Sequence, residues 1–211
     1  GEPHDYAHPG AYRYLDEIRK LLFDGKQKKA EALAMREFMS EPIRQMAYQA
    51  FGDLHIRMHP DDATPEDYRR ALSLDNALST VSYRLGDTHF MRETFATNPD
   101  QCIVWHAEAD KPGAITLDAW LTCAHDNAVF ERLGADTIRF TGHVADGAIQ
   151  FEARLLARTE GGSVEVTDDA HVVVKNADKV TLLLSGATNY VRYNDVSADP
   201  AARNAAALDA V

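Results

Sequence analysis

The sequence lacks the features that mark several large classes of protein. It has no cluster of Lys and Arg and a net charge of -11, which argues against nucleic-acid binding, because neutralising phosphates needs clustered cations. No run approaches the roughly 18 apolar residues of a membrane-spanning helix, and the GxSxG motif of serine hydrolases is absent. Since 45% of the residues are hydrophobic, a packed core is expected rather than disorder.

Cysteine is scarce too, with Cys102 and Cys123 alone in 211 residues. If 101–109 and 114–122 pair as a hairpin, the two thiols point to opposite faces of the sheet. A disulfide needs Cβ atoms about 3.5–4.5 Å apart and is then disfavoured. A shift of one residue in the turn would reverse that conclusion, so the redox compartment stays open.

The clearest pattern runs from Leu78 to Thr122. Apolar residues alternate with polar ones at its end, where Ile115, Leu117, Ala119 and Leu121 share one face, as in a sheet with one buried side. Gly- and Pro-containing turns interrupt the region three times. The sequence therefore predicts four consecutive antiparallel strands, at 78–85, 88–96, 101–109 and 114–122.

The rest of the chain extends this architecture. Helical periodicity predicts a two-helix hairpin at 11–23 and 27–39. Turn signals recur at about ten-residue intervals, which is typical of a large antiparallel sandwich. Further strands are expected at 48–58, 68–74, 130–133, 137–144, 148–157, 163–167, 171–175 and 180–186, the last of them central. The fold class is mainly β: a large antiparallel β-sandwich (super-sandwich) at 1–195 with the hairpin inserted near its N-terminus. Asp199-Pro200 starts a helical linker at 196–211.

The two tryptophans fall on opposite faces of the predicted sheet. Trp105 shares its face with the buried positions and is expected in the core. Trp120 lies among Thr116, Asp118 and Thr122 on the other face. It either packs beneath the helical hairpin or serves as an exposed platform for a sugar or a partner, so Trp120 is the candidate carbohydrate contact.

Metal and nucleophile motifs are weak. His55 and His59 stand four residues apart beside Asp61 and Asp62, but on an extended segment no third ligand is fixed by spacing. Solvated loop histidines account for the pattern, and no metal, cofactor or catalytic residue is predicted. Paired glycosidase carboxylates cannot be picked out among 33 acidic residues without a fold.

The order of segments resembles the N-terminal β-sandwich domain of the α-L-fucosidases of glycoside hydrolase family 95. The resemblance spans residue 1 to about 195 and departs from the family pattern at Glu2 and Ala50, where the family usually has Gly and Pro. The stretches that carry it are GEPHDYAHPGAYRYLDEIRKLLFDGKQKKAEALA, YQAFGDLHI, YRRALSLDNALSTVSYRLGDTHFMRETFATNPDQCIVWHAEADKPGAITL and ADKVTLLLSGATNYVRYND.

The resemblance implies a piece of a longer protein. Further strands would precede it, and an (α/α)6 barrel with the catalytic residues of an inverting mechanism would follow. The chain would then be a non-catalytic scaffold, inactive alone, with that barrel as partner and a fucosylated glycan as the parent's substrate; the parent would be secreted or periplasmic. An independent carbohydrate-binding sandwich module is the alternative. Bare strand edges would favour self-association of the fragment.

Overall fold

The computed structural model describes residues 5–43, 49–59, 64–145 and 147–210. The chain divides into two compact units, 1–49 and 50–211, and each is described by itself. Among the described residues, no helix has the length and apolar character that crossing a bilayer requires.

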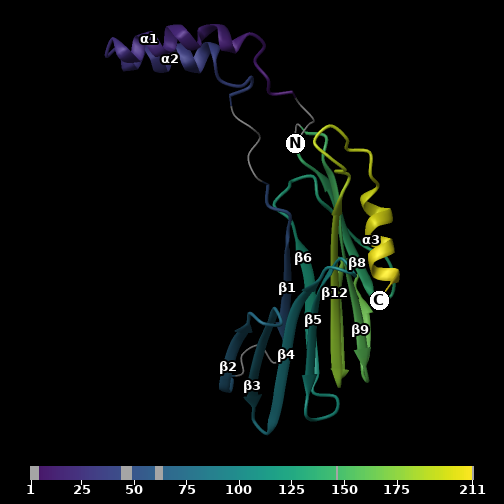
Figure 1. Cartoon of the computed structure of the whole chain (residues 1–211). Coiled ribbons are helices and arrows are strands. Elements are labelled where there is room, and N and C mark those ends of the chain that lie inside the picture. Colours follow the sequence, from purple (N-terminus) through teal and green to yellow (C-terminus); the bar gives the residue numbers. More distant parts are fainter. Residues whose placement is uncertain (1–4, 44–48, 60–63, 146, 211) are drawn as a thin grey trace. The chain divides into compact units, whose positions relative to one another are not determined.

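The first unit is the predicted helical hairpin (Figure 1). A 3-10 turn, η1 (Ala11–Tyr14), leads into α1 (Leu15–Phe23), and α2 (Gln27–Glu37) follows after a short turn. Gly25 makes this turn possible, because its φ of 68° is a left-handed conformation that glycine adopts without strain. The hairpin has a small buried contact, in which Ala30 and Leu33 of α2 are the buried apolar residues.

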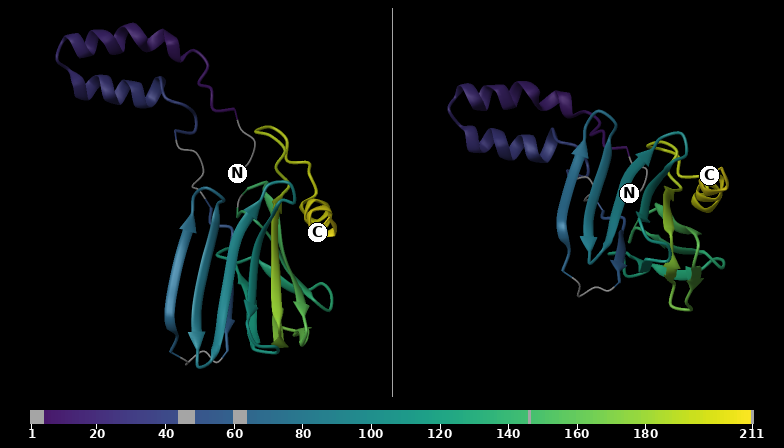
Figure 2. Two further views of the ribbon diagram at one scale, coloured as in Figure 1. Left: turned by 60° about the horizontal axis from the view of Figure 1, so that its bottom comes forward. Right: turned by 90° about the horizontal axis from the view of Figure 1, so that it is seen from below.

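The second unit is a sandwich of two antiparallel sheets (Figures 1 and 2). The eight-stranded sheet has the order β2-β3-β4-β5-β12-β9-β8-β7, and the four-stranded sheet has the order β1-β6-β11-β10. The strands are β1 (Asp53–Met58), β2 (Glu66–Ser73), β3 (Leu78–Leu85), β4 (Thr88–Thr97), β5 (Cys102–Ala109), β6 (Ile115–Thr122), β7 (Val129–Arg132), β8 (Thr137–His143), β9 (Gln150–Glu160), β10 (Ser163–Val166), β11 (His171–Ala177) and β12 (Lys179–Thr188). The predicted fold class, a large antiparallel sandwich with a helix pair near the N-terminus, is confirmed.

The core lies between the inward faces of the two sheets. On β6 the odd-numbered residues from Ile115 to Leu121 are buried, and the even-numbered ones are not, as the alternation predicts. Leu182 is fully buried on β12, which lies between β5 and β9, so the prediction of a central strand is confirmed. Trp105 packs against this core from β5, also as predicted.

The predicted hairpin between 101–109 and 114–122 is wrong. β5 pairs with β4 and β12, whereas β6 pairs with β1 and β11 in the other sheet. The segment around Lys111-Pro112-Gly113 therefore carries the chain from one sheet to the other. Cys102 and Cys123 are therefore not kept apart by the register of a shared hairpin, as predicted; they are free thiols in different surroundings.

The C-terminal helix α3 (Pro200–Asp209) begins where the sequence predicts it. Its N-cap is Asp199, whose Oδ1 accepts hydrogen bonds from the backbone N–H groups of Ala201 and Ala202 at 2.8 and 3.2 Å. The helix packs on the outer face of β9 and β12, where Leu208 joins a small second core with Leu156 and other residues. Its role as a linker to a further domain stays a prediction.

Candidate functional site

Trp120, the predicted carbohydrate contact, lies on the outward face of the four-stranded sheet. Its partners on the neighbouring strands are His55 on β1 and His171 on β11. Both imidazoles stack on the indole, with ring centroids 5.1 and 5.4 Å away and interplanar angles of 6° and 8°. The guanidinium carbon of Arg57 lies 5.3 Å from the indole centroid. Trp120 is thus the middle of a ladder of three rings across three strands.

This ladder limits what Trp120 can offer a sugar. A sugar ring that stacks on an aromatic side chain needs an open ring face, and here each face of the indole has an imidazole against it. The guanidinium of Arg57 also lies over the indole ring. The carbohydrate contact at Trp120 stays a prediction, and it would have to use ring edges and neighbouring polar groups.

The histidines of this face are engaged with neighbours rather than gathered around one point. A hydrogen bond of 2.9 Å joins His55 Nε2 and Thr122 Oγ1, and one of 2.8 Å joins His59 Nε2 and Asp118 Oδ2. In the described part of the chain, no three His, Cys, Asp or Glu side chains form a group that could hold a metal ion. Asp61 and Asp62, which the sequence places beside them, lie outside the described residues.

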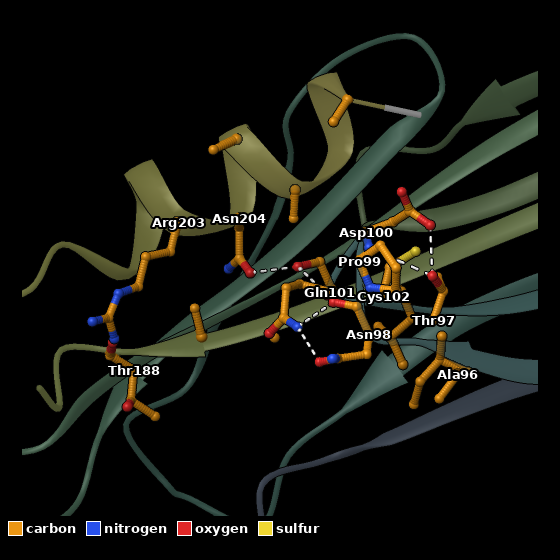
Figure 3. Close-up of a pocket in the computed structure, with 18 of the residues that line it drawn as sticks. Ala96, Thr97, Asn98, Pro99, Asp100, Gln101, Cys102, Thr188, Arg203 and Asn204 are labelled. Atoms are coloured by element: carbon orange, nitrogen blue, oxygen red, sulfur yellow. Dashed lines mark hydrogen bonds between the residues drawn. The ribbon is translucent and has the colours of Figure 1, made fainter.

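A groove of about 1160 Å³ lies on the second unit, between α3 and the turn that joins β4 to β5 (Figure 3). The β4–β5 turn forms one wall, the face of α3 from Arg203 to Ala210 forms another, and the end of β12 runs between them. Phe51 also lines the groove and packs directly over Gly186, where a Cβ atom would lie 2.8 Å from its ring. A larger residue at this position of β12 would therefore require the Phe51 ring to move.

Hydrogen bonds fix the conformation of the β4–β5 turn. Thr97 Oγ1 donates to Asp100 Oδ2 at 2.6 Å, and Gln101 Nε2 donates to the side-chain and main-chain oxygens of Asn98 at 3.0 and 2.5 Å (Figure 3). Gln101 itself has a φ of 53°, a left-handed conformation. The amide groups at this wall of the groove are therefore held in place by their neighbours.

Beneath α3 lies a buried polar network that no local pattern in the sequence indicates. Ser185 Oγ donates to Asn204 Oδ1 at 2.9 Å, and Asn204 Nδ2 donates to the Glu152 carbonyl oxygen at 2.9 Å. Glu152 is 1% exposed, and its carboxylate forms ion pairs with Arg154 Nε at 2.6 Å and Arg139 Nη1 at 3.5 Å. Two guanidinium groups and an amide compensate this buried charge, so the network ties α3 to the sheet.

The groove has few groups for acid–base chemistry. Asp100 is the one carboxylate among the described residues that line it. Glycoside hydrolysis needs two carboxyl groups, about 6.5–9.5 Å apart for inversion or about 5–5.5 Å apart for retention. The groove suits binding or packing better than hydrolysis.

The two unequal sheets, with a helix on the outer face of the larger one, define the second unit as a large antiparallel β-sandwich. The family described as "Glycosyl hydrolase family 65, N-terminal domain" matches residues 1–193. The chain therefore belongs to the glycosyl hydrolase family 65 N-terminal domain family. The resemblance that the sequence showed, to an N-terminal glycoside hydrolase domain, is confirmed.

Two relatives are each much longer than this chain. Alpha-L-fucosidase 2 of Arabidopsis thaliana is 30% identical over 217 residues, covering 90% of this chain and 25% of that protein. A solved structure named putative kojibiose phosphorylase from human microbiome superposes with a TM-score of 0.53 over 77% of this chain and 25% of that chain, at 11% identity. The second likeness concerns the fold alone. The chain spans about a quarter of the length of either relative.

Proposed function

We propose that this chain is the non-catalytic N-terminal domain of an α-L-fucosidase-like glycoside hydrolase of family 95, and that it scaffolds an (α/α)6 catalytic barrel. The observation that carries the proposal is the 30% identity to Alpha-L-fucosidase 2 over 90% of this chain, which corresponds to a quarter of that protein. The single carboxylate of the groove agrees with a domain that leaves the chemistry to another part of its protein.

The partner in this proposal is the barrel of the same protein, and a fucosylated glycan is the substrate of the whole. The conformation of the β4–β5 turn and the anchoring of α3 support a scaffolding role, because both present fixed rather than adaptable surfaces. Family membership alone fixes neither the substrate nor the reaction.

Activity assays test this proposal directly. The 211-residue chain is expected to release no fucose from an aryl α-L-fucoside or a 2-fucosyl oligosaccharide above a buffer blank, whereas the complete product of the gene is expected to turn over both. Turnover by the chain alone that Asp100→Asn abolishes, and that the exposed control Asp209→Asn leaves unchanged, would overturn the proposal.

The second candidate function is a carbohydrate-binding module, in which the ring edges and polar groups of the outward ladder of His55, Trp120 and His171 would contact the sugar. Calorimetric titration of the chain with fucosylated oligosaccharides separates the two candidates. A module would bind, and Trp120→Ala would abolish binding while Val173→Ala on the same sheet face would not. Under the scaffold proposal, no heat of binding is expected for any of the three chains.

A further inference from the structure

The larger sheet has a stretch of inward surface that no described strand faces. The smaller sheet has four strands against eight, and β2 and β3 extend past it (Figure 2). Every residue of β2 from Glu66 to Leu72 is exposed, although an inward face should be covered. We call the inward side of β2, β3 and β4 the Arg92 face; its members used below are Tyr68, Arg70, Leu72, Val81, Tyr83 and Arg92.

Strand register shows that Arg92 points inward. Its partners are Val81 on β3 and Ala107 on β5, and both of these pack in the core cluster. The guanidinium carbon lies 5.2 Å from the ring centroid of Tyr83. Arg92 Nε is buried and has no hydrogen-bond acceptor, and no ion pair of Arg92 exists among the described residues. A buried donor without an acceptor is unfavourable, and an acceptor placed against Arg92 Nε would remove that cost.

The charges of the Arg92 face are all of one sign. Arg70 lies opposite Val81, which lies opposite Arg92, so the two arginines stand in one row, about 9–10 Å apart at two strand spacings. No acidic side chain of the described β2, β3 and β4 shares this face. In a chain of net charge -11, such a surface is complementary to a carboxylate.

Apolar groups surround the arginines. Leu72 is 65% and Tyr68 is 53% exposed, and Val81 is partly buried. Burial raises the pKa of Tyr83, an effect that the cation of Arg92 opposes, so the phenol stays neutral and can donate a hydrogen bond. A ligand for this face thus has apolar side chains on both sides of an acidic one.

The edge of the smaller sheet nearest this face is open. In the described chain β1 pairs with β6 alone, and its other edge lies on the side of β2 to β4 (Figures 1 and 2). The inward residues Leu54, Ile56 and Met58 of β1 are only partly buried. A strand added there would lie under the Arg92 face, with its side chains alternating between that face and solvent.

We propose that the Arg92 face binds an extended polypeptide segment that pairs with the open edge of β1 and places an inward-facing Asp or Glu carboxylate against Arg92. Backbone hydrogen bonds to β1 set the direction of the segment. The carboxylate accepts from Arg92 Nε, and apolar residues two positions before and after it pack on Tyr68 and Leu72, which lie on either side of the row of Arg70 and Arg92.

The test uses two blocked nine-residue peptides, Lys-Thr-Val-Thr-Glu-Thr-Val-Thr-Lys and the same sequence with Gln for Glu. NMR titration of the chain follows the backbone amides and the side-chain Nε–H signal of Arg92. The Glu peptide is expected to bind at least about tenfold more tightly than the Gln peptide, because a hydrogen bond between charged groups contributes about 1.5–3 kcal/mol. The Arg92 Nε–H signal and the amides of β1 are expected to shift together.

Arg92→Gln should remove the preference for Glu, and Arg69→Gln, on the opposite face of β2, should preserve it. If Arg92→Gln fails to fold, Arg92→Met replaces it, because Met keeps most of the apolar length of the side chain and has neither a charge nor a donor. Equal affinity of the two peptides, or no saturable binding up to millimolar concentration, would overturn the proposal. So would the same shifts on addition of sodium acetate, which assign the site to a small anion, or on concentrating the chain alone, which assign it to a second copy.

Discussion

Single residues on β12 differ sharply in what they contribute to stability. Leu182 is completely buried between Trp105 and Ala157, whereas Leu184, two residues on, is only partly buried at the end of the core. Leu182→Ala should lower the free energy of unfolding by about 2–5 kcal/mol, since removing buried methyl groups leaves a cavity. Leu184→Ala should cost less. Urea unfolding of both variants checks this; equal midpoints for Leu182→Ala and the parent would show that β12 is not central.

The two cysteines should differ in reactivity. Cys102 is 5% exposed beneath α3, and burial raises the pKa of its thiol. Cys123 is partly exposed. We expect a thiol reagent at pH 8 to modify Cys123 first and Cys102 only on unfolding. Peptide mapping after brief labelling gives the order, with Cys123→Ser as control; rapid labelling of Cys102 in that variant would contradict the packing of α3.

For single residues, the alternation of apolar and polar side chains predicted which residues point outward on β6 but not on β4. The odd residues of β6 are all apolar, so Trp120 could be placed on the outward face from sequence. On β4 the inward row includes Phe90 and Arg92, and the outward row includes Met91 and Phe95, so neither row is marked as buried. An inward arginine therefore carried no signal in the sequence.

Among the elements, α3 depends on its cap and on its buried network. Asp199→Ala removes the acceptor for two backbone N–H groups and should destabilise the domain by about 0.5–2 kcal/mol. Asp209→Ala, at the other end of the same helix, is the matched control and should be neutral or slightly stabilising, because an acid there opposes the helix dipole. Thermal melts decide; equal losses for the two variants would contradict the capping role.

The buried hydrogen-bond network around Asn204 also holds α3 on the sheet, and a substitution at Asn204 tests this. It is fully buried between Ser185 and Glu152, so Asn204→Leu leaves polar partners of the network unsatisfied, at a cost of about 1–3 kcal/mol. Hydrogen exchange should accelerate in α3 more than in β6. The exposed Asn194→Leu is the control, and unchanged exchange in α3 would show that the network does not hold the helix.

Strand positions were predictable at the scale of elements, whereas strand partners were not. Turn residues and alternation are local signals, and they located β3 to β6 closely. Whether β6 pairs with β5 or crosses to the other sheet depends on β1 and β11, which lie far away in sequence. A turn such as Lys111-Pro112-Gly113 is compatible with either connection. The groove beside α3 depends on the same long-range packing and had no local signature.

At the scale of the whole molecule, the edge strand β2 is exposed to solvent but has features that discourage pairing with another strand. It forms one end of the eight-stranded sheet and has both faces exposed. Its pairing with β3 is irregular between Glu66 and Arg69, and Arg84 of β3 forms ion pairs with Glu66 and Asp67. Irregular register and charge are the devices by which natural sheets discourage edge pairing.

The charges of β2 are nevertheless self-complementary. Two acids, Glu66 and Asp67, stand beside two arginines, Arg69 and Arg70, so an antiparallel second copy at this edge can bring opposite charges together. We therefore predict weak, salt-sensitive dimers through β2. Light scattering at several concentrations should show a mass rising above 23.4 kDa at low ionic strength and returning to it in about 0.5 M salt, where exposed charges are screened. The double variant Arg69→Glu with Arg70→Glu should stay monomeric, because like charges then face each other. A constant mass near 23.4 kDa for the parent chain under every condition would refute the prediction.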